Sequence, residues 1–233
     1  MLFVVFWQSW RRQRRAAEKL LDTQDVTIRT LARQADLRDE NTGRHLERTA
    51  RYVGILARRL ARYSEFRGYL TPRYIEDLVK SAPLHDIGKV GVKDSILLKP
   101  GPLTAEESAE MKRHCEYGRR VLTQAQHDLA EESFLTMAAQ LCNSHHEHWD
   151  GTGYPLGLSG EQIPLSARIM ALADVYDALR TVRSYKPGLC HEETCRIIEG
   201  QAGRELDSRI VHAFMEGHEE FRAVSVEMAD AAA

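Results

Sequence analysis

Apolar residues recur at spacings of three and four along most of the chain, as in amphipathic helices. Stretches in which valine, isoleucine or threonine alternate with polar residues are missing, so no strand is predicted. The first helix should cover residues 11–38, which contain neither glycine nor proline. Further helices are predicted over residues 44–64, 72–85, 104–124, 130–144, from 164 through 177, 191–200 and 207–221. The pattern predicts an all-α fold in which a long helix precedes a compact bundle.

Three segments follow from this pattern. Residues 1–38 form an apolar and basic start followed by the long helix, residues 39–224 form the main domain, and residues 225–233 are expected to be a flexible tail. Within the main domain, Pro72 and Pro164 suit first helical turns. Thr104 and Glu107 have the spacing of a capping box.

The first ten residues, MLFVVFWQSW, differ from the rest because they are apolar and aromatic and run into four arginines within residues 11–15. A spanning helix needs about 20 apolar residues, so this run cannot cross a bilayer by itself. Two interpretations stay open: a membrane-proximal anchor, or the start of an amphipathic helix that packs on a partner. The helix over 11–38 is also expected to pair with a second copy or to transmit an upstream signal, although its heptads are too irregular to require a coiled coil.

The composition is that of an ordinary soluble protein, with 43% hydrophobic and 28% charged residues. The net charge of -2 gives no sign of binding to a nucleic-acid polymer. The four cysteines are scattered without a CxxC pair, so their spacing fits neither a zinc module nor a disulfide framework. Reduced thiols in the cytoplasm are the resulting expectation.

Two dense clusters of histidine and acidic residues carry the candidate chemistry: HDIGK at 85–89 and HHEHWDGTGYP at 145–155. Imidazole and carboxylate are the usual ligands of divalent transition metals. Adjacent helical residues point about 100 degrees apart, so His85 and Asp86 can reach one metal only near a helix end, which Gly88 supplies. The clusters suggest one metal centre assembled from distant segments.

Asp174 is the most unusual acid, because it lies in the apolar run IMALADV at 169–175, where a carboxylate is costly unless it is paired or bound to metal. Asp177 follows one turn later on the same face and can orient a ligand. His45 and His114, taken singly, are more typical of surface or hydrogen-bonded core residues. A helical protein whose histidines are merely hydrogen-bonded therefore stays open as the alternative to a metal site.

Several motifs occur together in a fixed order: HxxR at 45–48, HDIGK, a helix ending in a lone histidine, HHExWDGTGYP, ARIMALADVYDAL at 167–179 and RSYK at 183–186. In this order they resemble the HD-GYP branch of the HD-domain metal phosphohydrolases, over roughly residues 36–221. The resemblance implies an all-helical HD-domain bundle with two or three metal ions, usually iron or manganese. It also implies hydrolysis of the bacterial second messenger cyclic di-GMP to linear pGpG, GMP or both.

The resemblance assigns roles to individual residues. The implied metal ligands, with Asp86 bridging two ions, are His45, His85, Asp86, His114, His145, His146 and Asp174. The implied catalytic residues are Asp86 and Lys89, the lysine lying against phosphate. The expected substrate contacts are Tyr154, Arg183, Lys186 and Asp177. Two metals can activate a water and clamp phosphate oxygens, while Lys89 can neutralise the phosphate or protonate the leaving 3′ oxygen.

The leading hypothesis is thus a metal-dependent cyclic di-GMP phosphodiesterase, with cyclic di-GMP and a GGDEF or other signalling protein as partners. A second hypothesis is an HD-type hydrolase of another cyclic dinucleotide or nucleotide. A third is a low-turnover domain that binds cyclic di-GMP or a protein. The intact histidines and acids favour catalysis, and the Gly-Tyr-Pro segment favours cyclic di-GMP.

One position departs from the family pattern and generates a prediction. Members with three metals have a glutamate four residues before the HxxR histidine, where this chain has Asn41. An amide oxygen is a weaker ligand and brings no charge to balance a third cation, so we predict two metal ions. Asn41→Glu should raise the number of metal ions bound per chain, measured by elemental analysis. Three tightly held ions in the unmodified protein would contradict the prediction.

Overall fold

The computed structural model describes residues 2–36, 44–181 and 188–229. The described elements are α1 (Leu2–Asp36), α2 (His45–Leu60), α3 (Ser64–Arg67), α4 (Pro72–Ser81), η1 (Ala82–Leu84), η2 (Ile87–Gly91), α5 (Asp94–Leu97), α6 (Ala105–Lys112), α7 (His114–His127), α8 (Phe134–Ser144), η3 (Gly160–Gln162), α9 (Leu165–Arg180), α10 (His191–Gly200) and α11 (Ser208–Glu227). Over these ranges no residue belongs to a named strand, and the predicted all-α fold is confirmed.

Several helix boundaries differ from the expectation: α1 already begins at Leu2, and α2 ends at Leu60. The predicted helix over 104–124 is two helices, α6 and α7, which are separated at Arg113. The helix that begins at Pro72 ends at Ser81 and continues as the 3-10 turn η1, since Pro83 has no N–H and cannot continue an α-helical ladder. α11 extends beyond residue 221 to Glu227 and therefore includes the start of the expected tail.

Side-chain caps fix where several helices begin. The Thr71 hydroxyl accepts from the backbone N–H of Tyr74 at the start of α4. The predicted capping box of Thr104 and Glu107 is present at α6. Ser133 caps α8 in the same way as Thr71 caps α4. Each such cap satisfies a backbone donor that the first turn of a helix leaves unpaired.

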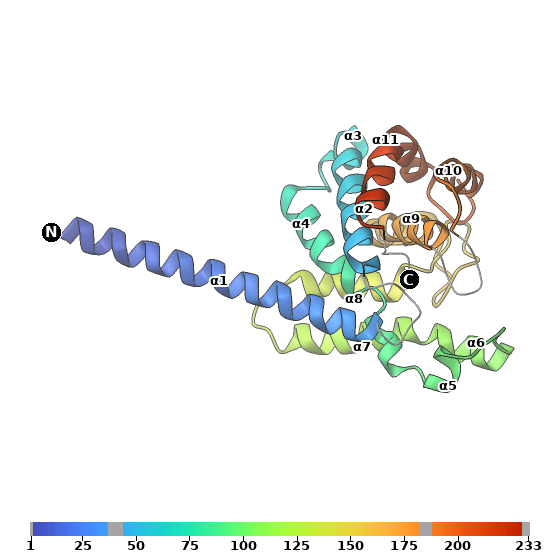
Figure 1. Cartoon of the computed structure of the whole chain (residues 1–233), viewed down its shortest axis with the longest axis horizontal. Helices are drawn as coiled ribbons and strands as arrows, with labels where there is room; N and C mark the ends of the chain where they lie inside the picture. The colour runs from blue at the N-terminus through green and yellow to red at the C-terminus, as the bar shows by residue number, and fades with distance from the viewer. Residues whose placement is uncertain (1, 37–43, 182–187, 230–233) are drawn as a thin grey trace.

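The main core lies where α2, α9 and α11 pack together, with α4 and α8 on its edges (Figure 1). Its centre is aromatic: Tyr52 stacks on Phe221 at a centroid distance of 4.5 Å. Tyr176 meets Tyr52 edge to face at 5.1 Å and also contacts Phe214. These rings are fully buried, and they hold α9, which carries Asp174, in a fixed position against α2.

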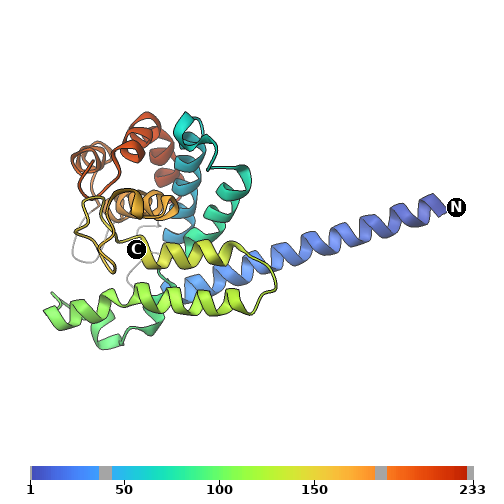
Figure 2. The ribbon, with the colours of Figure 1, turned by 180° about the vertical axis from the view of Figure 1, so that it is seen from behind.

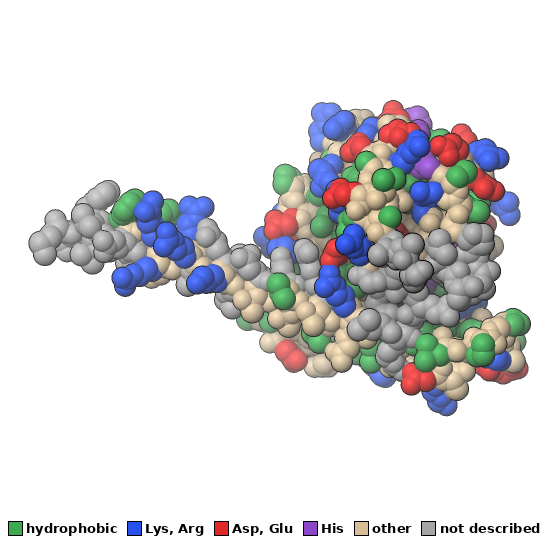
Figure 3. Space-filling view, in the orientation of Figure 1, with side chains coloured by type: hydrophobic (Ala, Val, Ile, Leu, Met, Phe, Trp, Pro, Cys, Tyr) green, Lys and Arg blue, Asp and Glu red, His purple; other side chains and the backbone are tan. Residues whose placement is uncertain are grey.

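A smaller apolar cluster lies beneath the end of α1. Ala32 of α1 packs there with Leu84, Leu122 and Cys142, from η1, α7 and α8. α7 and α8 form an antiparallel hairpin alongside this contact (Figure 2). The rest of α1 extends away from the bundle and presents basic side chains to solvent (Figure 3). No helix in the described part of the chain is long and apolar enough to span a bilayer.

A buried carboxylate links α9 to α11. Asp207 caps α11 by accepting from the backbone of Arg209, and its Oδ2 also accepts from Nη1 of Arg168 at 2.7 Å. Burial raises the pKa of Asp207, but hydrogen bonds from Arg209 and Arg168 outweigh it and hold the pKa below its usual value. The ionised carboxylate therefore stabilises the folded state above the unfolded pKa of about 3.9.

Asp207→Asn should lower the free energy of unfolding by about 3 kcal/mol at pH 7, because it breaks a buried ion pair. The difference from the unmodified chain should shrink as the pH falls below about 4, toward the lowered pKa of the folded carboxyl. Urea unfolding at several pH values measures both effects. The matched control is Glu161→Gln, which removes an exposed carboxylate from Arg209 and should cost less than about 1 kcal/mol. Equal losses in the two variants would contradict the assignment.

Candidate metal centre

The seven predicted ligands come from five places in the chain and converge between α2, α7, α8 and α9. α2 begins with His45, His85 and Asp86 lie between η1 and η2, and α7 begins with His114. His145 and His146 directly follow the last residue of α8, and Asp174 lies on α9. Most of these side chains therefore lie at a helix end, as expected for His85 and Asp86, where successive residues can turn toward one point.

Gly88 allows the segment after Asp86 to approach α7. A Cβ atom on Gly88 would lie 1.9 Å from the carbonyl oxygen of His114 and 2.5 Å from the amide nitrogen of Gly118. Neither contact can be relieved by a side-chain movement, because both involve backbone. Glycine at position 88 is therefore required for Asp86 and His114 to come together.

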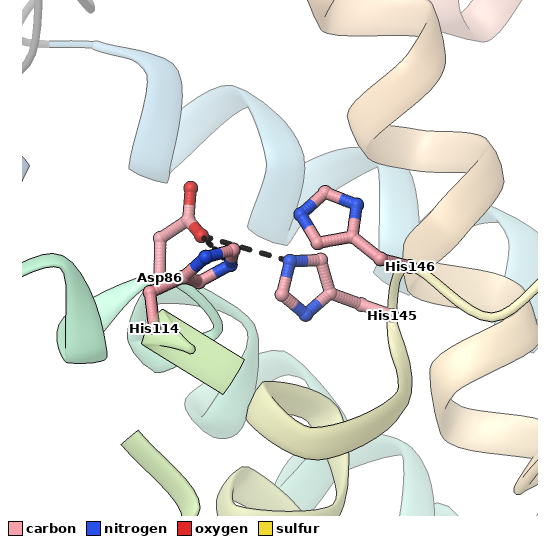
Figure 4. A group of neighbouring side chains, drawn as sticks. All are labelled: Asp86, His114, His145 and His146. Atoms are coloured by element: carbon pink, nitrogen blue, oxygen red, sulfur yellow. Dashed lines mark ion pairs between the residues drawn. The ribbon is translucent and has the colours of Figure 1, made fainter. Parts of the chain in front are cut away.

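The first ligand group consists of four side chains whose donor atoms lie within 4.8 Å of one another: Asp86, His114, His145 and His146. Oδ1 of Asp86 is 3.3 Å from Nε2 of His114 and 3.6 Å from Nε2 of His145 (Figure 4). These separations are close to those between neighbouring ligands around one ion with metal–ligand bonds of about 2.0–2.2 Å.

The second ligand group, His45, His85 and Asp174, meets the same distance criterion. Oδ1 of Asp174 lies 3.7 Å from Nε2 of His45 and 3.9 Å from Nε2 of His85. Asp86 connects the groups, since its second oxygen, Oδ2, is 3.4 Å from Nε2 of His85. One carboxylate thus faces both groups, which is the arrangement required of a bridging ligand.

Four imidazoles are each held through their Nδ1 atom. The Nδ1 atoms of His85, His114 and His145 lie 2.8–2.9 Å from the backbone oxygens of Ala82, Met111 and Leu141. A carbonyl can only accept, so each Nδ1 must carry a hydrogen, and the lone pair of the neutral ring is then on Nε2. His45 has the same arrangement, with a carboxylate oxygen of Asp177 as acceptor at 2.8 Å. Metal-binding histidines are held by contacts of this kind.

Several of the atoms that face the centre lack hydrogen-bond partners. Among the described residues, the buried atoms without one include Nε2 of His45, His85 and His145, together with Oδ1 of Asp86. Leaving several buried polar atoms unsatisfied in one place is costly. Metal coordination would satisfy all four, so the donor set fits transition-metal ions.

The charges of the centre are strongly coupled. Burial raises the pKa of Asp86, but Lys89 and His85 outweigh it and hold the pKa well below the usual range. Burial lowers the pKa of His85, yet Asp86 and Asp174 more than compensate and raise it to about 9. Burial lowers the pKa of both His145 and His146, which keeps these rings neutral and available as ligands at neutral pH.

Asp177 contacts His45 on the side of the ring that faces away from the centre. Its two oxygens accept from Nε and Nη2 of Arg48 at 2.7 and 2.9 Å, and it also holds Nδ1 of His45. The residue is only 1% exposed. These contacts favour the orienting role expected for Asp177 rather than its alternative role as a substrate contact.

The predicted catalytic lysine and loop tyrosine both border the centre. Nζ of Lys89 lies 2.7 Å from Oδ2 of Asp86. The Tyr154 ring stacks on His146, with centroids 4.7 Å apart, and Nζ of Lys112 lies 4.8 Å from the centroid of the tyrosine ring. The peptide bond between Tyr154 and Pro155 is cis.

Glu147 has a structural role that was not predicted. Its carboxylate is 2% exposed and accepts from the backbone N–H groups of Leu156 and Leu158, which fixes the Gly-Tyr-Pro loop. His148 forms a hydrogen bond with Thr152 within the same loop. An acid directly after two predicted ligands is the available signal, but its partners are backbone groups that a sequence pattern does not reveal.

Cys115 is a second residue without a predicted role. Its sulfur lies 3.4 Å from Nε2 of His114 and is fully buried.

Three residues named in the sequence predictions, Asn41, Arg183 and Lys186, lie outside the described residues.

Comparison with known proteins identifies the family of the chain. The HD domain family matches residues 26–210. The chain belongs to this family, in its HD-GYP branch. A cyclic di-GMP phosphodiesterase of Vibrio cholerae is 50% identical over 90% of this chain and 43% of its own length. One from Thermotoga maritima is 40% identical over 82% of this chain and 48% of its own length.

A third relative, a 3′3′-cGAMP-specific phosphodiesterase of Vibrio cholerae, is 38% identical over 91% of this chain and 38% of its own length. The crystal structure of a cyclic GMP-AMP-specific phosphodiesterase of Vibrio cholerae shares the fold, with a TM-score of 0.61 at 21% identity, over 88% of this chain and 51% of that one. The HD-GYP chain spans less than half the length of each of the three curated relatives named here.

Gly88→Ala should lower the free energy of unfolding by about 3 kcal/mol, because the added methyl group overlaps the backbone of α7. It should also reduce the metal bound per chain, since Asp86 and His114 would be forced apart. Thermal unfolding and elemental analysis measure the two effects. Gly68→Ala is the matched control, because a Cβ there meets nothing within 4 Å. A Gly88→Ala protein with unchanged stability and metal content would contradict the close-approach argument.

Proposed function

We propose that this HD-GYP domain is a metal-dependent phosphodiesterase that hydrolyses cyclic di-GMP to linear pGpG, GMP or both, and so lowers the level of the messenger. The observation that carries the proposal is the inward orientation of the histidine Nε2 atoms around Asp86, with four rings held by Nδ1 contacts. Relatives that are 40–50% identical and named cyclic di-GMP phosphodiesterases support the choice of substrate.

The proposed cofactors are two transition-metal ions, one for each ligand group, with Asp86 between them. Imidazole-rich sites favour iron, manganese or zinc over magnesium, and we propose iron or manganese. When bound, the ions would supply activation of water and neutralisation of the phosphate charge. A third ion is not proposed, because Asn41 stands where the family pattern has glutamate.

The chain's own residues would bind and orient the dinucleotide. Lys89 is held at the edge of the centre by Asp86, where its ammonium can neutralise a phosphate or protonate the leaving 3′ oxygen, directly or through water. Tyr154, whose ring stacks on His146, is proposed to stack on a guanine or bond to a phosphate. Arg183 and Lys186 are proposed to contact the second phosphate, since guanidinium and ammonium groups suit that anion.

A second substrate is favoured by one observation. The relative named as 3′3′-cGAMP-specific matches 91% of this chain, so replacement of one guanine by adenine is the closest competing chemistry. Cyclic GMP-AMP carries the same two phosphodiesters and therefore places the same demands on the metal centre. Discrimination would depend on contacts to the bases.

The N-terminal segment is proposed to regulate the domain. The end of α1 packs on η1 and η2, which flank His85 and Asp86. A change in the position or pairing of α1 would therefore act close to the ligands. The candidates that could move α1 are a second copy of the chain, a GGDEF or other signalling protein, or a nearby membrane. Sedimentation of the whole chain measures whether it forms dimers.

The direct test incubates manganese- or iron-loaded protein with cyclic di-GMP and, separately, with 3′3′-cGAMP, and follows the products by chromatography. We expect cyclic di-GMP to be cleaved faster than 3′3′-cGAMP. Asp86→Asn should reduce turnover more than a hundredfold, because even changes behind the ligands commonly cost about 10–100-fold. The control is Asp128→Asn, an exposed aspartate at the end of α7.

The outcomes separate the candidate functions. Preferred cleavage of 3′3′-cGAMP would establish the second substrate instead. Binding of cyclic di-GMP without cleavage of any cyclic dinucleotide by the metal-loaded protein would contradict an enzymatic role and favour a binding domain. Equal turnover in Asp86→Asn and Asp128→Asn would show that the chemistry does not use this centre.

A further inference from the structure

Three potential ligands gather outside the HD centre, where α10 meets α11. His191 and Cys195 lie on successive turns of one face of α10, and His218 faces them from α11. Donor atoms of the three side chains lie within 4.8 Å of one another. The cluster shares no residue with the catalytic ligand groups.

The distances in the cluster suit a tetrahedral ion. Sγ of Cys195 is 3.6 Å from Nε2 of His191, and zinc bonds of standard length place a nitrogen and a sulfur ligand roughly 3.6 Å apart. Nε2 of His191 is 2.8 Å from Nδ1 of His218, which is a hydrogen bond through one shared proton. A cation would replace that proton and separate the rings to roughly 3.3 Å. The His218 side chain is 33% exposed and has room for this shift.

A buried hydroxyl orients the central ligand. The Tyr176 hydroxyl lies 2.8 Å from Nδ1 of His191, and the tyrosine is fully buried in the aromatic core. If this hydroxyl accepts from Nδ1–H, Nε2 of His191 is left as the donor to a metal, as for the histidines of the HD centre. Oε1 of Glu219 is 3.7 Å from Nδ1 of His218 and adds negative charge at the open side.

We propose that His191, Cys195 and His218 bind one zinc ion, separate from the catalytic metals, that ties α10 to α11. A thiolate among imidazoles selects zinc over manganese. Tyr176, which contacts His191, lies two residues after Asp174 on α9, so the ion would also brace the helix that supplies a catalytic ligand. This site does not depend on the substrate proposed above.

Cobalt(II) reports on the site because it occupies zinc sites and shows a charge-transfer absorption when a thiolate binds it. Manganese-loaded full-length chain is titrated with cobalt(II), and absorption and bound metal are measured. We expect a thiolate band whose final intensity corresponds to one thiolate-bound cobalt per chain, and which disappears when zinc is added; cobalt that replaces manganese in the HD centre does not contribute to this band. Cys195→Ser should lose the band, and His218→Gln should weaken cobalt binding at least tenfold.

Two cysteine controls identify the sulfur. Cys190→Ser changes the exposed residue that precedes α10 and should keep the band. Cys115→Ser removes the sulfur beside His114 in the HD centre and should also keep it. His218→Gln alters a partly exposed side chain, so it tests the site even if Cys195→Ser folds poorly, as checked by circular dichroism. No thiolate band in the native chain, or a band lost in Cys115→Ser and kept in Cys195→Ser, would overturn the proposal.

Discussion

The carboxylate of Asp86 is the contact on which the centre depends. One of its oxygens faces His114 and His145, and the other faces His85 and Lys89. Without it, two groups of imidazoles from distant segments would share a buried space with little negative charge between them. Burying such groups is favourable only when charges are paired or metals are bound, so the fold and the chemistry impose the same requirement here.

The scaffold meets that requirement with rigid backbone contacts. Backbone carbonyls one turn earlier in the chain fix the rings of His85, His114 and His145. Two glycines, Gly88 and Gly118, allow the η2 segment and α7 to touch. The aromatic core beneath α9 fixes the position of that helix, which carries Asp174 on the opposite side of the centre. Ligand positions held this firmly lose little entropy on binding metal, which is the advantage of a preorganised site.

Much of this arrangement could be predicted from the sequence. Helical periodicity predicted the all-α fold and most of the helices, and the ordered motifs supplied the seven predicted ligands, whose side chains lie together in the structure. Helix interruptions at Arg113 and Pro83 were missed, because the apolar pattern continues across both positions while the backbone hydrogen bonding changes. The buried role of Glu147 depends on backbone groups nine and eleven residues away, and local patterns do not encode such contacts.

The cluster of His191, Cys195 and His218 shows a second limit of prediction from sequence. Cysteine spacing alone argued against a zinc module, since the expected signal was a pair of cysteines. The structure instead combines one cysteine with histidines on two helices, and the i, i+4 spacing of His191 and Cys195 was the available signal. Contacts between helices that are separated by a loop of several residues become visible only once the packing is known.

The most direct measurement is an anomalous-scattering map of crystals of the iron- or manganese-loaded chain. The account predicts two strong peaks a few ångströms apart: one among His114, His145 and His146, the other among His45, His85 and Asp174, with Asp86 between them. A map without peaks at these positions, from protein that is folded and has been supplied with metal, would contradict it.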